Sequence, residues 1–373
     1  MSNTRDRITD MALEAGFDLV GFGPPSPAAE TARRFDAWID AGRHGDMAWL
    51  AKNRERIVDA SRYVTGVRGA IALGFEYSGE AAAVGEAKLA RYAAGRDYHR
   101  ALGKRLERLH AGLDAEGIGA GTLRHGVDAV PILERSLAAQ AGIGFLAKSS
   151  GIIHPSHGPW LLLAEVLHGE DIEPSGPARG SCGTCTACLD ACPTQAIVAD
   201  HQVDARRCLS YTTIEKRGLI DWELRSPQAD WLFGCDVCIE VCPFTSRAKR
   251  RRADDTDLAL HPAVETYTLV GVLDMSIDDW NRDWTGTAVR RAKREGLRRN
   301  AAIVAANLGL EAATPSLRLC LADADPGVRS AAAWALAKLG TERRAIEDAL
   351  AREGDALVRA DIERSLEAFA HIG

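Results

Sequence analysis

Two short runs of cysteine constrain this chain more than any other feature of its sequence. The first run, SCGTCTACLDACPT, spans residues 181–194, and the second, FGCDVCIEVCPF, spans residues 233–244. The first has the spacing Cys-x2-Cys-x2-Cys-x3-Cys-Pro, in which three thiolates bind one iron–sulfur cluster and the fourth binds another. The spacing therefore predicts a ferredoxin-like segment that holds two [4Fe–4S] clusters.

The second run lacks one cysteine, because Leu232 stands where the counterpart of Cys182 is expected. The remaining cysteine of this region lies between the runs and is the candidate for the missing ligand. We assign one cluster to Cys182, Cys185, Cys188 and Cys242, and the other to Cys192, Cys208, Cys235 and Cys238. Zinc sites also use paired Cys-x2-Cys units, and disulfides form in oxidising compartments. Neither alternative requires the Cys-x3-Cys-Pro ending that both runs share.

Composition and length indicate a multidomain protein with a packed core. The chain has 373 residues, of which 46% are hydrophobic and 26% charged. No apolar run approaches the roughly 20 residues that a helix needs to cross a bilayer. The N-terminal residues have neither a signal-peptide core nor a twin-arginine signal. We expect a cytoplasmic protein without membrane association, because thiols stay reduced there, and we expect a monomer.

Residues 1–172 predict an α/β domain in which strands alternate with helices. The expected strands are residues 18–23, 68–77, 127–130 and 160–167, and the expected helices are residues 5–15, 87–116 (interrupted near 94–95) and 132–140. Pro131 is expected at the first helical position. Such a layered domain is large enough for a sizeable cofactor. It contains no phosphate loop and no dinucleotide-binding fingerprint.

The C-terminal residues contain a helical repeat. The segments 298–309, 329–340 and 359–369 each begin with arginine, continue with small residues and end near Leu-Gly or Phe. This pattern is typical of HEAT-like helical pairs, which bury their apolar faces by stacking. The predicted fold is therefore a multidomain α+β and α/β protein. Its parts are residues 1–172, a ferredoxin-like domain at 173–250, a connecting segment at 251–285 and HEAT-like repeats at 286–373.

Basic residues are concentrated in two places, although the net charge of the chain is −6. One cluster is RAKRRR at residues 247–252, and the other is VRRAKREGLRR at residues 289–299. Local positive charge of this kind binds RNA phosphates, while a solvated helix face is the alternative interpretation. The candidate contacts are Arg290, Arg291, Lys293, Arg294, Arg298 and Arg299.

Five stretches of sequence together resemble the epoxyqueuosine reductases, which are cobalamin-dependent enzymes of tRNA modification. They are ARYAAGRDYH (90–99), VDAVPILERSLAAQAGIGFLAKSS (127–150), GPWLLLAEVL (158–167), DARRCLSYTTIEKRG (204–218) and RAKREGLRRNAAI (291–303). The resemblance spans nearly the whole chain in the right order. It implies that residues 1–172 bind cobalamin and that residues 286–373 bind tRNA.

The resemblance also implies an activity, the reduction of epoxyqueuosine to queuosine at the wobble position of tRNA. An external one-electron donor, such as flavodoxin or ferredoxin, would supply electrons through the two clusters and reduce the cobalt of cobalamin to Co(I). Two other functions fit part of the sequence. One is a cobalamin-dependent reductive dehalogenase, and the other is an electron-transfer ferredoxin fused to a scaffolding repeat.

Asp128 is the residue that the resemblance identifies as the proton donor. A carboxyl group against an apolar macrocycle loses solvation and retains a proton that it can then deliver. A helix-capping aspartate is the alternative interpretation.

The candidates for cofactor contacts are Arg56, Tyr92, Asp97, Tyr98, Lys148, Ser210, Tyr211 and Asp236. Cys320 lies outside the cysteine runs and is predicted to be a core residue.

Overall fold

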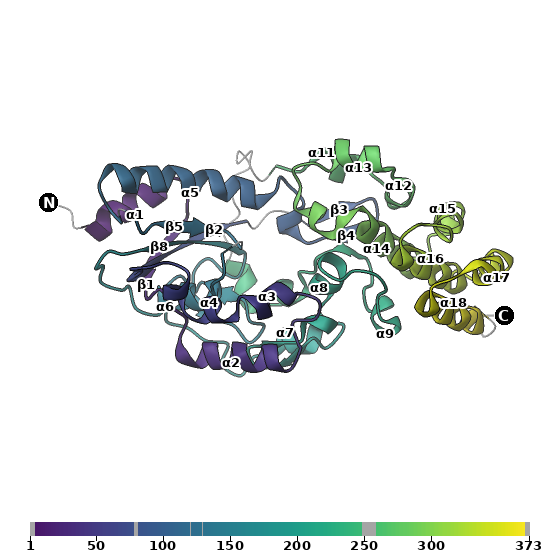
Figure 1. Ribbon diagram of the computed structural model, residues 1–373, viewed down its shortest axis with the longest axis horizontal. Coiled ribbons are helices and arrows are strands. Elements are labelled where there is room, and N and C mark those ends of the chain that lie inside the picture. Colours follow the sequence, from purple (N-terminus) through teal and green to yellow (C-terminus); the bar gives the residue numbers. More distant parts are fainter. Residues whose placement is uncertain (1–3, 78–80, 120, 129, 248–258, 370–373) are drawn as a thin grey trace. The chain divides into compact units, whose positions relative to one another are not determined.

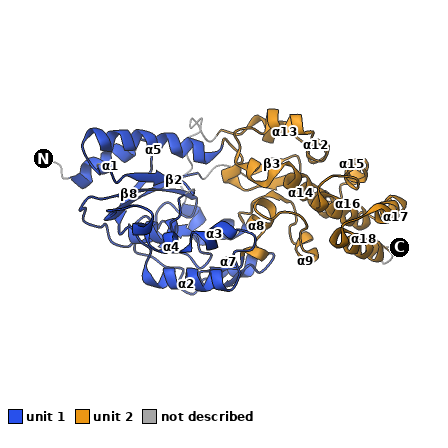
Figure 2. Ribbon diagram, in the orientation of Figure 1, with its two compact units in different colours: residues 1–79, 97–204, 237–257 blue, residues 80–96, 205–236, 258–373 orange. Residues whose placement is uncertain are grey.

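The computed structural model describes residues 4–77, 81–119, 121–128, 130–247 and 259–369. These residues form two compact units, each assembled from separate stretches of the chain (Figure 1, Figure 2). Unit 1 comprises residues 1–79, 97–204 and 237–257, and unit 2 comprises residues 80–96, 205–236 and 258–373. The chain therefore leaves unit 1 and returns to it twice before the C-terminal helices begin.

A four-stranded antiparallel sheet forms the centre of unit 1. Its strand order is β1 (Leu19–Gly23), β2 (Gly69–Glu76), β8 (Leu161–His168) and β5 (Arg124–Gly126). Every residue of β2 is buried, because helices cover both faces of the sheet. A strand covered on both faces carries apolar residues continuously instead of alternating them with polar ones.

The helices of unit 1 form the two outer layers. On one face, α1 (Thr4–Glu14) and α5 (Tyr98–Ala115) lie side by side (Figure 1). Arg105 of α5 places its guanidinium 4.7 Å from the ring centre of Phe75 in β2. On the other face, α6 (Glu134–Gln140) packs Leu137 and Ala138 against β2 and β8.

The remaining helices and strands of unit 1 are α2 (Ala29–Asp40), α3 (Ala48–Lys52), α4 (Arg54–Val58), β6 (Phe145–Leu146), β7 (Ile152–Ile153), α7 (Ala187–Ala191), β9 (Ile197–Ala199), β10 (Gln202–Val203) and α10 (Val237–Glu240).

Unit 2 combines a small sheet with the C-terminal helices. In the sheet, β4 (Ala87–Leu89) lies between β11 (Trp231–Phe233), which is parallel to it, and β3 (Ala82–Val84), which is antiparallel. The helices are α8 (Leu209–Ile214), α9 (Trp222–Arg225), α11 (Pro262–Thr266), α12 (Leu269–Asp274), α13 (Ile277–Asp283), α14 (Lys293–Asn307), α15 (Thr314–Cys320), α16 (Pro326–Lys338), α17 (Arg343–Arg352) and α18 (Ala356–Phe369).

The predicted repeat helices correspond to α14, α16 and α18, which pack on one another in that order. Their small residues are buried, including Ala301 to Ala306 in α14 and Ala331 to Ala333 in α16. Small side chains at these positions let neighbouring helices approach closely. Cys320 is 1% exposed at the end of α15, which confirms that it is a core residue.

The structure corrects two of the predicted elements. Residues 87–116 are not one long helix. Residues 87–89 form a strand that pairs with two others, and α5 begins only after Asp97. The side chain of Asp97 caps this helix by accepting a hydrogen bond from the backbone N–H of His99. Residues 127, 128 and 130 do not form the predicted strand, since β5 ends at Gly126 and Asp128 has a φ of 54°, while residue 129 lies outside the described residues. The following helix begins at Glu134, so Pro131 does not occupy its first position.

The predicted division into domains also differs from the two units. Residues 205–236 group with unit 2 and the flanking stretches with unit 1, while a ferredoxin-like domain at residues 173–250 stays a prediction. Contacts with distant parts of the chain produce this division, which the order of motifs along the sequence does not reveal. By contrast, the expected elements at residues 5–15, 18–23, 68–77 and 160–167 are confirmed as α1, β1, β2 and β8.

Gly21 provides a test of the packing between β1 and α6. A Cβ atom there would lie 2.1 Å from the backbone oxygen of Ala141, so Gly21→Ala must push the helix away from the sheet. We expect a loss of about 1–3 kcal/mol in the free energy of unfolding, measured by urea denaturation. Gly103→Ala in α5 is the control, because its Cβ meets nothing within 4 Å and alanine favours a helix. Equal effects of the two substitutions would contradict this packing.

Candidate functional site

Five cysteines of unit 1 line one pocket. Cys182, Cys185 and Cys188 come from the first run, and Cys238 and Cys242 come from the second. The other residues of the pocket are Ala147, Ser149, Ile153, Ala187, Pro243 and Phe244. Four of the five cysteines, all except Cys238, are the set that the spacing assigns to one cluster, and Cys238 is assigned to the other.

The surroundings of this pocket are apolar. Phe145 and Phe244 meet edge to face with their ring centres 5.4 Å apart, and both pack near Cys182 and Cys242. Burial raises the pKa of Cys188 and Cys242, and the neighbouring cysteines raise it further. Thiolates this close repel one another, so the pocket suits a group that brings positive charge, as the iron of a cluster does.

The other four cysteines of this region, Cys192, Cys208, Cys235 and Cys238, are divided between the two units. Cys192 follows α7, and its sulfur accepts a hydrogen bond from the backbone of Ala196 at 3.2 Å. Cys238 lies in α10 of unit 1, whereas Cys208 precedes α8 and Cys235 follows β11 in unit 2. The grouping of these four as ligands of a second cluster stays a prediction from the spacing.

Asp128 lies in the loop after β5 in unit 1, together with the first residues of α5. The hydroxyl of Tyr98 donates a hydrogen bond to the carboxylate of Asp128. His99 Nε2 is 3.7 Å from Asp128 Oδ2, and its Nδ1 is 2.7 Å from Asp97 Oδ1. Residues 97–99 therefore orient the carboxyl group, whose side chain remains 45% exposed and accessible to a substrate.

Two further carboxyl groups lie close to Asp128. Glu134 opens α6, and its carboxyl group interacts electrostatically with that of Asp128. Glu165 of β8 is 1% exposed, and both of its carboxyl oxygens lack a hydrogen-bond partner among the described residues. Burial, followed by repulsion from Asp128, raises the pKa of Glu134 to about 8. Burial also raises the pKa of Glu165, to which the charges of Glu134 and Asp128 add.

The cofactor candidates of unit 1 have different surroundings. Arg56 is exposed on α4. Lys148 is only 15% exposed and forms an ion pair of 3.4 Å with Asp200. Asp97 and Tyr98 contact His99 and Asp128, as described above, so they position the carboxyl group.

The cofactor candidates of unit 2 lie near β11 and α8. Asp236 is 2% exposed and accepts a hydrogen bond of 2.7 Å from the backbone of Arg91. Tyr92 lies with its ring centre 6.4 Å from that of Phe233. Tyr211 is buried in α8, and the adjacent Ser210 is partly exposed. The carboxylate of Asp236 thus has a structural role in holding the residues after β4.

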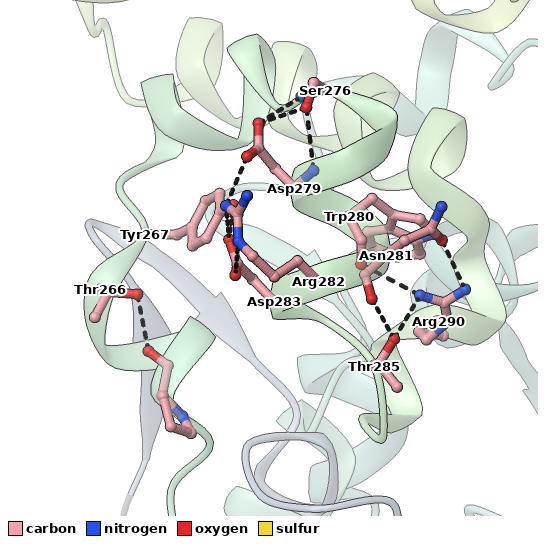
Figure 3. A network of polar contacts seen from close by, with 11 residues as sticks. Thr266, Tyr267, Ser276, Asp279, Trp280, Asn281, Arg282, Asp283, Thr285 and Arg290 are labelled. Atoms are coloured by element: carbon pink, nitrogen blue, oxygen red, sulfur yellow. Dashed lines mark hydrogen bonds and ion pairs between the residues drawn. The ribbon is translucent and has the colours of Figure 1, made fainter.

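The basic residues before α14 are partly exposed, and Arg290 is held in a polar network (Figure 3). Its guanidinium donates to the oxygen of Trp280 at 3.2 Å and to Thr285 and Asn281 at 3.3 Å. The same group lies 5.2 Å from the ring centre of Trp280. This arrangement keeps a positive charge in one place beside α13.

The neighbours of Arg290 are arranged differently. Arg291 forms a two-point ion pair with Glu215, at 2.7 and 2.9 Å. Arg294 donates to the backbone oxygen of Met275 at 2.8 Å. Lys293 is exposed and has a φ of 62°, a conformation that costs energy in any residue other than glycine.

Arg298 and Arg299 are buried, with exposed fractions of 7% and 2%. Arg299 donates to the backbone oxygens of Thr212, Lys216 and Gly218 at 2.8 to 2.9 Å. Arg298 forms an ion pair with Asp323. These two guanidiniums hold the helices of unit 2 together, and their burial argues against the phosphate contacts predicted for them. Of the basic cluster at 247–252, residues 248–252 lie outside the described residues.

Three residues of the carboxyl site were not singled out from the sequence. His99 is the third residue of the DYH stretch, and Glu134 belongs to the LER stretch. Of the three, Glu165 is the residue that the sequence could have identified as functional, because it is a charged residue within the apolar segment WLLLAEVL. A carboxyl group in a buried strand costs free energy unless it is paired or protonated, so its presence indicates a function.

Family models match three parts of the chain. Residues 58–129 match the model described as epoxyqueuosine reductase QueG, and residues 181–245 match a 4Fe-4S double cluster binding domain. Residues 285–367 match HEAT repeats. Fold and site therefore define an iron–sulfur oxidoreductase with a HEAT-repeat domain.

Curated relatives identify the family. An epoxyqueuosine reductase of Gloeobacter violaceus is 38% identical over 308 residues, which cover 81% of this chain and 95% of that protein. One of Xanthomonas campestris is 34% identical and covers 90% of this chain and 96% of that protein. The chain belongs to the epoxyqueuosine reductase family.

Solved structures agree with this assignment. An epoxyqueuosine reductase crystallised with an epoxyqueuosine-modified tRNA-Tyr stem loop has a TM-score of 0.88 at 26% identity, covering 98% of both chains. A Bacillus subtilis epoxyqueuosine reductase whose catalytic aspartate loop is swung out of the active site has a TM-score of 0.83 at 27% identity, with 98% coverage of both chains. Among the described residues, no helix is both long and apolar enough to cross a membrane.

The pocket of unit 1 leads to a prediction about iron content. Cys242→Ala removes one of four thiols at a single cluster, so we expect the protein to lose that cluster and about half of its iron. Iron analysis and electron paramagnetic resonance after anaerobic purification measure the loss. Cys320→Ala is the control, because this buried thiol is remote from both runs in the sequence and should leave the iron content unchanged. Full iron content in Cys242→Ala would show that this cysteine is not a ligand.

Proposed function

We propose that this chain reduces epoxyqueuosine in tRNA to queuosine. Its relatives of that name cover most of its length, and the tRNA stem loop bound to a structural neighbour supports tRNA as the substrate. The reaction removes the epoxide oxygen as water and consumes two electrons and two protons. The observation that carries the proposal is the half-exposed Asp128, held by Tyr98 and faced by His99.

In this proposal, Asp128 protonates the oxygen that leaves the substrate. Its φ of 54° places it in a tight loop between β5 and α6, and such a conformation in an aspartate is typical of active-site loops. The Bacillus subtilis relative has a catalytic aspartate on a loop that can swing out of its active site. We infer that the loop of Asp128 corresponds to it, and that Tyr98 and His99 orient the carboxyl group for proton transfer.

Cobalamin is the cofactor that family membership implies, and it would supply a strongly reducing, nucleophilic cobalt to the reaction. One feature of unit 1 fits a large polar-edged cofactor. The hydroxyl of Ser150 is buried without a hydrogen-bond partner among the described residues, close in sequence to Lys148. An amide group at the edge of a corrin would satisfy it. We propose Arg56, Lys148, Tyr92, Ser210 and Tyr211 as further contacts, while Asp97 and Tyr98 position Asp128 and Asp236 holds the backbone.

Two [4Fe–4S] clusters would pass electrons one at a time from an external donor such as flavodoxin or ferredoxin. We propose the ligand sets that the spacing assigns, with Cys208 completing the second cluster in place of Leu232. If Cys208→Ala kept both clusters, this assignment of ligands would be wrong. A cytoplasmic location and a monomeric state are consistent with a tRNA-modifying enzyme and remain part of the proposal.

The two alternative functions account for less of the chain. A reductive dehalogenase would not need a HEAT-repeat domain for a small substrate, and a simple electron carrier would not need the α/β part of unit 1. The curated relatives that cover 81% and 90% of this chain are all named epoxyqueuosine reductases, which favours the tRNA-modifying activity.

Asp128→Asn tests the proton donor. Asparagine keeps the shape of aspartate but has no acidic proton, so we expect kcat to fall by about 10²- to 10⁴-fold while tRNA binding is retained. Conversion of epoxyqueuosine tRNA under anaerobic conditions, followed by mass spectrometry of the nucleosides, measures the rate. Asp114→Asn in α5 is the control, because this side chain is 56% exposed and lies outside the site. Normal turnover by Asp128→Asn would remove Asp128 from the mechanism.

We propose that Arg290, Arg291, Lys293 and Arg294 contact tRNA phosphates. Lys293→Glu should weaken tRNA binding and reduce the slope of log affinity against log salt by about one, because each phosphate contact releases counterions. Arg344→Glu in α17 is the control, since it makes the same charge change at a side chain that is 89% exposed. Binding isotherms at several salt concentrations measure both. Identical slopes for the two variants would exclude this surface.

A further inference from the structure

Glu165 lies in a row of small residues that crosses the sheet of unit 1. Gly21, Ala72, Glu165 and Gly126 are successive partners in the register of β1, β2, β8 and β5. Partners in an antiparallel sheet point to the same face. A Cβ at Gly21 would meet Ala141, which ends α6, and a Cβ at Gly126 would meet Val130. This face of the row is therefore covered by α6 and by the loop that carries Asp128.

The packing of β8 confirms that Glu165 faces α6. Leu163 and Leu167 flank it on the same side of the strand, where they belong to the cores formed with Ala138 and Leu137 of α6. Glu165 is thus enclosed between the sheet and the helix that begins with Glu134. No hydrogen bond reaches its carboxyl oxygens among the described residues, so this acid is enclosed without a polar partner.

The charges around Glu134 favour its protonated form. Its side chain is 20% exposed, its carboxyl group interacts with that of Asp128, and the charges of both act on the buried Glu165. Arg135, whose Nε is 3.8 Å from Glu134, opposes this effect, but its side chain is 56% exposed and solvent weakens its influence. Adjacent carboxyl groups do not both ionise readily, so the pair retains a proton.

We propose that Glu134 is the proton reserve of Asp128, a role that rests on the proposed reduction of epoxyqueuosine. Breaking the carbon–oxygen bonds and forming the alkene and water takes two electrons, which the external one-electron donor supplies, and two protons. Glu134 passes its proton to Asp128, and Asp128 delivers it to the leaving oxygen. The partly exposed Glu134 then regains a proton from solvent and passes it to Asp128, which delivers this second proton to complete water. The buried Glu165 stays protonated.

Glu134→Gln tests this role, because glutamine keeps the size and polarity but stores no proton. We expect kcat to fall at least about tenfold, with KM for the tRNA unchanged, since Glu134 acts on the substrate through Asp128 in this proposal. Glu134→Asp retains a carboxyl group and should recover part of the rate. Glu107→Gln, an exposed position of α5, is the matched control and should turn over normally.

Infrared spectroscopy of the proteins at neutral pH provides a readout that does not depend on turnover. The wild type should show a deuterium-sensitive carbonyl band of a protonated carboxylic acid that Glu134→Gln lacks, that Glu134→Asp shifts and that Glu107→Gln retains. If Glu134→Gln fails to fold, as circular dichroism and iron content would show, the wild type and Glu134→Asp still decide the assignment. Absence of a band that responds to position 134, or wild-type kcat in a folded Glu134→Gln protein, would overturn the proposal.

The same experiments separate this inference from the proposed function. If the wild type failed to convert epoxyqueuosine tRNA, the proposed function would be wrong whatever the infrared band showed. If the wild type converted the tRNA but Glu134→Gln matched it, the function would stand and the proton reserve alone would fail.

Discussion

The return of Cys242 to the pocket of Cys182, Cys185 and Cys188 is the constraint on which the rest of the structure depends. Thiolates that bind one cluster must lie within a few ångströms of one another, so the chain between them has both ends anchored in unit 1. That intervening chain includes residues 205–236, which belong to unit 2. There Arg299 and Asn300 of α14 bind the backbone oxygens of Thr212 and Leu232. The stretch of chain between the cysteines of the pocket therefore also supplies backbone oxygens that α14 binds.

The acids of unit 1 are placed where they cost stability. A carboxyl group such as Glu165, enclosed without a hydrogen-bond partner among the described residues, does not stabilise the fold. Retaining a proton reduces that cost, because a neutral acid loses much less hydration than a carboxylate does. This low cost agrees with the proton-transfer role proposed for Asp128 and Glu134, since an enzyme that releases water from an epoxide needs a supply of protons.

Arginine serves two purposes within one short segment of unit 2. Arg298 forms an ion pair with Asp323, and Arg299 donates hydrogen bonds to backbone oxygens inside the unit. By contrast, the side chains of Arg290 and Lys293 remain accessible to solvent. Burying a guanidinium is expensive, but several hydrogen bonds to carbonyl oxygens offset the lost hydration. The stretch VRRAKREGLRR thus includes both a surface charge and part of the core, although its residues look alike in the sequence.

The sequence by itself determined the features that depend on local spacing. These are the paired cysteine runs, the repeat that became α14, α16 and α18, the buried strands β2 and β8, and the family to which the chain belongs. Tertiary structure alone decided what depends on distant partners. Residues 87–89 form a strand because β11 pairs with them, and Glu165 is buried because α6 covers its face of the sheet. Burial of Arg299 follows from carbonyl oxygens more than 80 residues away, which no local pattern reveals.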